Sequence, residues 1–87
     1  EQATHRELTI RILNDTNRAA QKLQTRPGVD QLIVDGQLIR FEFEGEVEDQ
    51  AAIVAWLVSE GFEVAEVSSH KKSLEDVFLH VTEGLVQ

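Results

Sequence analysis

Several residue types are scarce or missing in this chain of 87 residues, and each gap excludes a class of function. The chain contains no cysteine, which excludes disulfide bonds, thiolate metal sites and cysteine nucleophiles. No apolar run approaches the roughly 20 residues that cross a bilayer, and no segment resembles a signal peptide. Eight Lys and Arg stand against sixteen Asp and Glu, a net charge of -8. Such a charge disfavours binding to nucleic acid or to an anionic membrane surface.

What remains is enough for one small domain. A chain of this length with 41% hydrophobic residues predicts a single modest core. Residues 1–6 are polar and show no period, as in a linker remnant, residues 7–83 form the domain, and residues 84–87 form a tail. Because the chain opens without Met, we expect it to be a piece of a longer protein or a processed one.

Hydrophobic periodicity divides the domain into alternating strands and helices. Strands are predicted at 7–13, 29–34, 37–44 and 62–67, and helices at 15–25, 50–60 and 73–83. The polar run SSHKK (68–72) reads as a connection. This order predicts an α+β fold, a ferredoxin-like split βαββαβ sandwich with an additional C-terminal amphipathic helix. Right-handed crossovers place both crossover helices on one face of the sheet, with the first and third strands central.

Two local signals fix details of this fold. Asp35-Gly36 between two apolar runs predicts a two-residue hairpin loop, which pairs Val34 with Gln37, Ile33 with Leu38 and Leu32 with Ile39. Pro27 and Gly28 end the first helix, and Asn14, Asp15 or Thr16 begins it. Asp49 is the expected cap of the second helix, and Phe62 after Gly61 is expected to fold back on Leu57. The predicted inner faces of the two helices are Ala19, Ala20 and Leu23, and Ala52, Ile53, Trp56 and Leu57.

The predicted last helix carries an apolar stripe that must be buried. Ser73 and Asp76 resemble a capping box, with Asp in place of the usual Glu or Gln. The stripe follows the i, i+3, i+4, i+7 pattern of a docking face and consists of Leu74, Val77, Phe78 and Val81. We expect it to fold back over the open face of the sheet, near Leu13, Ile33 and Leu38, or over the sheet's edge. The alternative is that it docks on another subunit or on a missing part of the chain.

A search for catalytic and ligand-binding chemistry finds no defensible catalytic, cofactor or metal site. Of the histidines, His5 falls in the predicted linker and His70 in the predicted connection, while His80 follows Asp76 by one helical turn as an ordinary surface pair. There is no phosphate loop and no nucleophile elbow. Five acids lie within eight residues, which suits a solvated strand and an acidic helix start better than a hard-cation site: Glu42, Glu44, Glu46, Glu48 and Asp49. The residues therefore indicate a binding or regulatory module.

The ending SLEDVFLHVTEG resembles the close of many ATP-binding subunits of ABC transporters, especially subunits of type-2 exporters that pair with a separate permease. The matching positions are Ser73, Leu74, Glu75, Asp76, Val77, Phe78, Leu79 and Thr82. Upstream, PGV at 27–29 and EGFEV at 60–64 fall in the same order as in that C-terminal accessory domain. The resemblance covers roughly residues 7–83, and its specific part is the last dozen.

The resemblance implies a non-catalytic accessory domain that mediates subunit contacts or regulation in an ATP-driven exporter. ATP and Mg²⁺ would act in the ATPase core of the parent chain, since no nucleotide-binding motif of that core occurs in these residues. The implied partners are the preceding ATPase domain, a second copy and a membrane permease, and the implied location is the cytoplasm, peripheral to the inner membrane. A stand-alone ligand-sensing regulatory domain of the same fold is the alternative function, and a small enzyme is a third.

Overall fold

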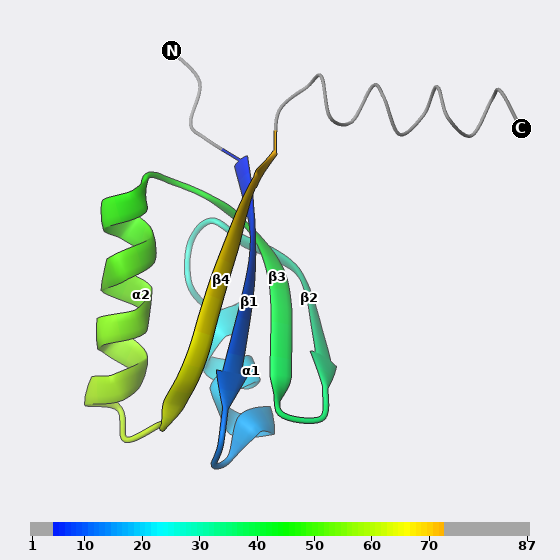
Figure 1. Ribbon diagram of the computed structural model, residues 1–87, viewed down its shortest axis with the longest axis vertical. Helices are drawn as coiled ribbons and strands as arrows, with labels where there is room; N and C mark the ends of the chain where they lie inside the picture. Colours follow the sequence, from blue (N-terminus) through cyan, green and yellow to red (C-terminus); the bar gives the residue numbers. More distant parts are fainter. Residues whose placement is uncertain (1–4, 73–87) are drawn as a thin grey trace, which may run out of the picture.

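The computed structural model describes residues 5–72, which form a four-stranded sheet and two helices (Figure 1). The elements in order are β1 (His5–Ile12), α1 (Thr16–Gln24), β2 (Val29–Asp35), β3 (Leu38–Glu44), α2 (Val47–Ser59) and β4 (Val64–Lys72). The sheet order is β2-β3-β1-β4, and every neighbouring pair is antiparallel. The predicted split βαββαβ fold with β1 and β3 central is therefore confirmed. The predicted helix 73–83 lies outside the described residues.

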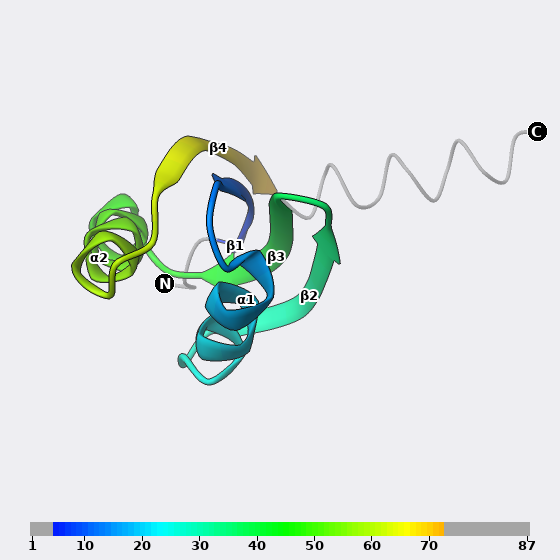
Figure 2. The ribbon, with the colours of Figure 1, turned by 90° about the horizontal axis from the view of Figure 1, so that it is seen from below.

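Both helices cover the same face of the sheet, as right-handed crossovers require. Figure 2 shows the sheet curving around α1, while α2 lies beside β4 at the border of the sheet. The buried core fills the space between these layers and consists of Leu8, Ile10, Ile12, Ala19, Ala20, Leu23, Ile39, Phe41, Phe43, Ile53, Leu57 and Phe62. Most of the predicted inner faces are thus confirmed. Ala52 is exposed, however, and Trp56 is only partly buried against this core.

Two predicted strand bounds are too short, and both concern polar residues. β4 continues to Lys72, so the run SSHKK is strand and not a connection. β1 begins at His5, inside the predicted linker, and pairs His5 with Lys72 and Glu7 with His70. The start of β1 and the end of β4 are both strand because their backbone N–H and C=O groups bond to each other. This pairing does not depend on apolar side chains.

The β2–β3 hairpin is paired one residue away from the predicted register. Asp35 pairs with Leu38 and Val34 with Ile39, so the loop is Gly36-Gln37. Gly36 has φ 62, a conformation that suits glycine at the first loop position of a type II′ hairpin. The Asp35-Gly36 dipeptide therefore predicts a hairpin correctly but places its loop one residue too early.

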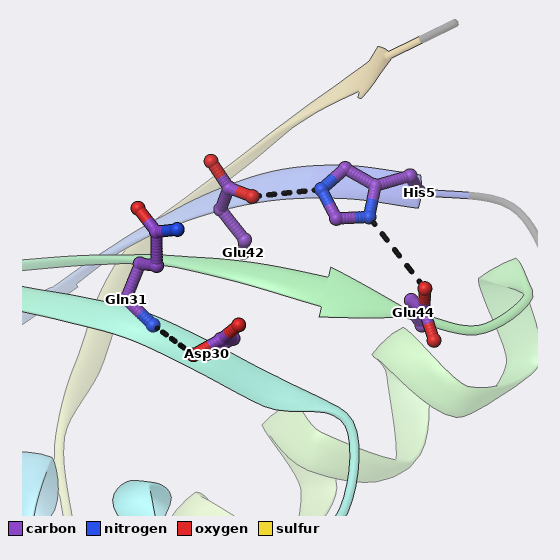
Figure 3. Close-up of polar contacts among 5 residues, drawn as sticks. All are labelled: His5, Asp30, Gln31, Glu42 and Glu44. Carbon is purple, nitrogen blue, oxygen red and sulfur yellow. Dashed lines mark hydrogen bonds and ion pairs between the residues drawn. The ribbon is translucent and has the colours of Figure 1, made fainter. Parts of the chain in front are cut away.

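A β-bulge in β2 accompanies this shift. Between the pairs Asp30–Glu42 and Ile33–Arg40, β2 has two residues where β3 has one. Gln31 takes φ 52, and its N–H donates to Asp30 Oδ1 at 2.9 Å (Figure 3). The extra residue shifts the alternation of side chains along β2 by one position. Val29 and Leu32 therefore both pack against the core although they are three residues apart.

The connections around the helices depend on two polar side chains. α2 begins at Val47, three residues before the predicted start, with Glu46 as its N-cap residue. Asp49, the predicted cap, instead accepts the Glu46 N–H through Oδ2 at 2.8 Å. Asn14 joins the start of α1 to the end of α2, since its Nδ2 donates to the Gly61 carbonyl at 3.2 Å and its Oδ1 accepts the Glu63 N–H at 2.7 Å. Phe62 is buried, and its N–H donates to the Leu57 carbonyl at 3.1 Å, as the expected fold-back requires.

Candidate interaction surfaces

The residues predicted to dock lie outside the part of the chain that the structure describes. They are the stripe Leu74, Val77, Phe78 and Val81 and the cap residues Ser73 and Asp76. Their role stays a prediction. The surfaces of residues 5–72 can nevertheless be compared as partners for such a stripe or for another protein, and three of them differ in chemistry.

The open face of the sheet, away from the helices, is dominated by charged side chains. Paired residues share a face, and the registers align Asp30, Glu42, Glu7 and His70 in one row across all four strands. Three carboxylates therefore occupy adjacent positions on neighbouring strands, an arrangement that costs stability where the charges are not compensated.

His5 makes a polar contact with one carboxylate of this row. Its Nε2 lies 2.7 Å from Glu42 Oε1, and its Nδ1 lies 4.0 Å from Glu44 Oε2 (Figure 3). His5 and Glu42 come from adjacent strands, β1 and β3, so the pair crosses the middle of the sheet. Among residues 5–72, no group of three or more His, Asp or Glu side chains is arranged to hold a metal ion. The His5–Glu42 contact links the two central strands of the sheet.

The acidic run of the sequence is divided between two places. Glu42 and Glu44 belong to β3, whereas Glu48 and Asp49 lie in the first turn of α2, where the helix dipole favours negative charge. The interpretation of these acids as a solvated strand and an acidic helix start is the one that the fold supports.

Apolar side chains on the open face are few and lie toward its hairpin end. Ile33 is 58% exposed and is paired with Arg40, while Leu38 is paired with Arg11. Arg11 in turn reaches Glu66 of β4 at 3.5 Å. A helix laid across this face would remove these charges from water, which is costly unless each is paired. The open face is therefore a poor match for an apolar stripe.

The side of α2 that faces α1 forms a second surface with its own contacts. The Arg26 guanidinium lies 4.6 Å from the centroid of the Trp56 ring, and Lys22 Nζ lies 3.1 Å from Glu60 Oε1. These contacts join α2 to α1 and to the segment that follows α1. Trp56 is thus a partly buried anchor with a cationic neighbour, close to its predicted core role.

The opposite side of α2 is the third surface, and it is apolar and exposed. Val47 is 57% exposed and Val58 is 56% exposed. With Ala51 and the half-buried Val54 they follow the spacing i, i+4, i+7, i+11, so the four side chains form one ridge along the helix. We call these four residues the α2 ridge. Sequence reasoning missed the ridge because the helix was predicted to begin at residue 50, which leaves out Val47.

Residues 5–72 form a βαββαβ sandwich with a charged sheet face and an exposed apolar helix ridge, which places them in the class of small α+β domains of ferredoxin-like type. Within residues 5–72, no helix is long and apolar enough to cross a membrane. Residues 1–82 match the family described as ATP-binding protein DrrA1-3-like, C-terminal domain, and the chain belongs to this family. The resemblance to the C-terminal accessory domain of an ABC transporter ATP-binding subunit is therefore confirmed. A comparison with curated proteins finds no match.

Proposed function

We propose that this chain is a non-catalytic accessory domain that acts through protein contacts in an ATP-driven exporter, either by joining subunits or by regulating the ATPase. The observation that carries the proposal is the match of residues 1–82 to the C-terminal domain of an ATP-binding protein family. A C-terminal domain of such a protein follows the part that binds ATP, so its own contribution is made through contacts with other parts of the assembly.

The chemistry of the described surfaces supports a contact role. His5, on the open face, contacts two carboxylates of β3. The α2 ridge offers apolar area without charge, which is the kind of surface that protein partners cover. The predicted stripe of residues 74–81 would add a second apolar surface of this kind.

The proposal places the domain among specific partners. These are the preceding ATPase domain of the same chain, a second copy and a membrane permease, while ATP and Mg²⁺ would be held by the ATPase core. The domain would then lie in the cytoplasm and be peripheral to the inner membrane through the transporter complex. A net charge of -8 suits this arrangement, since it disfavours direct adsorption to anionic lipid.

The native coding sequence upstream of Glu1 tests the proposal most directly. We expect a phosphate loop with its Lys and Ser/Thr and a signature motif about 100–200 residues upstream, one domain length away. Deleting residues 7–83 from that parent subunit should leave nucleotide binding intact and reduce coupled transport. An upstream sequence without an ATPase core would overturn the proposal.

A ligand screen separates this function from that of a stand-alone sensor. Thermal unfolding of the chain should show no shift with amino acids, nucleotides or divalent metals, because the accessory domain binds proteins. A ligand that binds only the folded state raises the unfolding temperature in proportion to its concentration above Kd. Reproducible stabilisation by one of these compounds would favour the ligand-sensing alternative.

A further inference from the structure

One border of the molecule combines an unpaired strand edge with the α2 ridge. β4 is an edge strand of nine residues, and within residues 5–72 only β1 pairs with it. Its row of unpaired backbone groups is a template for a further strand. Figures 1 and 2 both place α2 beside β4, beyond the end of the sheet order.

The α2 ridge points toward this border. Trp56 faces α1 through its contact with Arg26. On a helix with 3.6 residues per turn, the ridge and Trp56 lie on opposite sides of the buried residues Ile53 and Leu57. The ridge therefore faces away from α1, on the same side as β4. The strand edge and the apolar ridge therefore lie at the same border of the molecule.

The ridge is complementary to a second copy of itself. In an antiparallel arrangement about a two-fold axis, Val47 of one helix meets Val58 of the other, and Ala51 meets Val54. Such isologous contacts use the same patch on both subunits. The small Ala51 allows the helices to approach closely, and the two exposed valines at the ends each gain an apolar partner.

The charges of β4 suit the same symmetry. The strand carries Glu66 near its start and His70, Lys71 and Lys72 at its end. In an antiparallel pair, residues directly opposite each other point to the same face of the sheet. A two-fold axis that pairs β4 with its copy must therefore pass between one residue and the same residue of the copy. An axis at Ser68 pairs Glu66 with His70, and an axis at Ser69 pairs Ser68 with His70. The first register places an acidic side chain opposite a basic one, which favours antiparallel pairing about this axis.

We propose that the border formed by β4 and the α2 ridge is the contact between two copies of this chain. The two sheets join through β4 into one continuous sheet of eight strands, and the two α2 helices pack together on its helix-bearing face. This inference rests on the proposed function in subunit contacts and names the surface that makes them. It accounts for an edge strand and an apolar helix side that are exposed within residues 5–72.

The mass of the full chain in solution, measured by sedimentation or light scattering across a concentration series, tests the proposal. We expect a reversible dimer. Val58→Lys adds a charge to the ridge and suits the C-terminal turn of a helix, where cations are favourable. It should weaken the dimer at least about tenfold. Ile33→Lys is the matched control, since Ile33 is 58% exposed against 56% for Val58 but lies on the opposite edge strand β2.

Single cysteines can locate the axis, because the chain has no thiol of its own. Under mild oxidation, Ser68→Cys or Ser69→Cys should give a covalent dimer, since in each register one of these residues meets itself. Gln37→Cys, in the loop at the other edge of the sheet, should stay monomeric.

Three results would overturn the proposal: a monomeric full chain, equal weakening by Val58→Lys and Ile33→Lys, or crosslinking through Gln37→Cys alone. A monomeric full chain whose version ending at Lys72 dimerises would assign the border to residues 73–87 instead of a second copy. None of these results touches the upstream ATPase sequence, so failure of this inference is distinguishable from failure of the proposed function.

Discussion

The two helices of this domain cover the same face of the sheet but have different outer sides. α1 buries Ala19, Ala20 and Leu23 and presents polar residues such as Asn17 and Gln21 to solvent. α2 buries Ile53 and Leu57 and presents valines and alanines on the side away from α1. A helix that is apolar beyond its core face is expected where further burial occurs. The comparison shows that α1 has one apolar side, which the core buries, whereas α2 has a second apolar side that is exposed and that we propose contacts a second copy.

The largest expected effect tests whether the inner faces of the two helices are equivalent. Leu23 and Leu57 are both fully buried, so Leu23→Ala and Leu57→Ala should each reduce the free energy of unfolding by about 2–5 kcal/mol, from lost burial and the cavity left behind. Urea unfolding followed by circular dichroism measures both. A loss below about 1 kcal/mol for Leu57→Ala alone would mean that α2 is weakly attached.

The next effect concerns the link between the start of α1 and the end of α2. Asn14→Ala removes the hydrogen bonds to Gly61 and Glu63 and should cost about 1–2 kcal/mol. Asn14→Asp keeps an acceptor for the Glu63 N–H and should cost less. Asn17→Ala, on the exposed side of α1, serves as the control. Equal losses for Asn14→Ala and Asn17→Ala would show that the link contributes nothing specific.

A smaller effect is expected where α1 and α2 meet through a cation and a ring. Arg26→Ala should cost about 0.5–1 kcal/mol through loss of the contact with Trp56. Because Trp56 is the only tryptophan, its fluorescence should change in this variant and not in Arg18→Ala, whose side chain is exposed on α1. Unchanged emission in Arg26→Ala would argue that the contact is not formed in solution.

The smallest expected change in stability comes from lysine substitutions on the exposed sides of α1 and α2. At low protein concentration, Gln21→Lys on α1 and Val58→Lys on α2 should each change stability by no more than about 0.5 kcal/mol, since both sites are exposed. At high concentration only Val58→Lys should lower the unfolding temperature relative to the unmodified chain, because association stabilises the folded state by mass action. Identical behaviour of the two variants at every concentration would remove the distinction between the helices.

The parts of this fold that follow from hydrophobic spacing could be predicted from the sequence. Alternation in β1 identifies Leu8, Ile10 and Ile12 as core residues, and all three are fully buried. The order of the elements and the handedness of crossovers give the sheet order. These features were predictable because many residues contribute to each of them, so an error at one position does not change the result.

The features that escaped prediction each depend on one or two residues. The hairpin loop could begin at Asp35 or Gly36, and the bulge at Gln31 has no glycine to mark it. The start of α2 involves both Glu46 and Asp49, of which the aspartate has the stronger preference for a cap. The polar end of β4 is strand only because β1 pairs with it, which is information that lies about 60 residues away in the chain.

The candidate surfaces also differ in how far they could be predicted from local sequence. The apolar stripe of the predicted last helix is a local pattern and is visible in the sequence. The α2 ridge depends on two facts of the structure, that the helix begins at Val47 and that Trp56 lies on the side facing α1. Which side of an apolar helix remains uncovered depends on its neighbours in space.

The pairing of His5 with Lys72 has a mechanical consequence. Within residues 5–72, β1 is the first strand and β4 is the last, and these antiparallel neighbours bring the start of β1 beside the end of β4. Force that pulls these two ends apart would break the β1–β4 backbone pairs one after another and would not act on all the pairs at once. Separation would begin at the polar pairs between His5 and Lys72 and would reach Val64, which packs against the core, last.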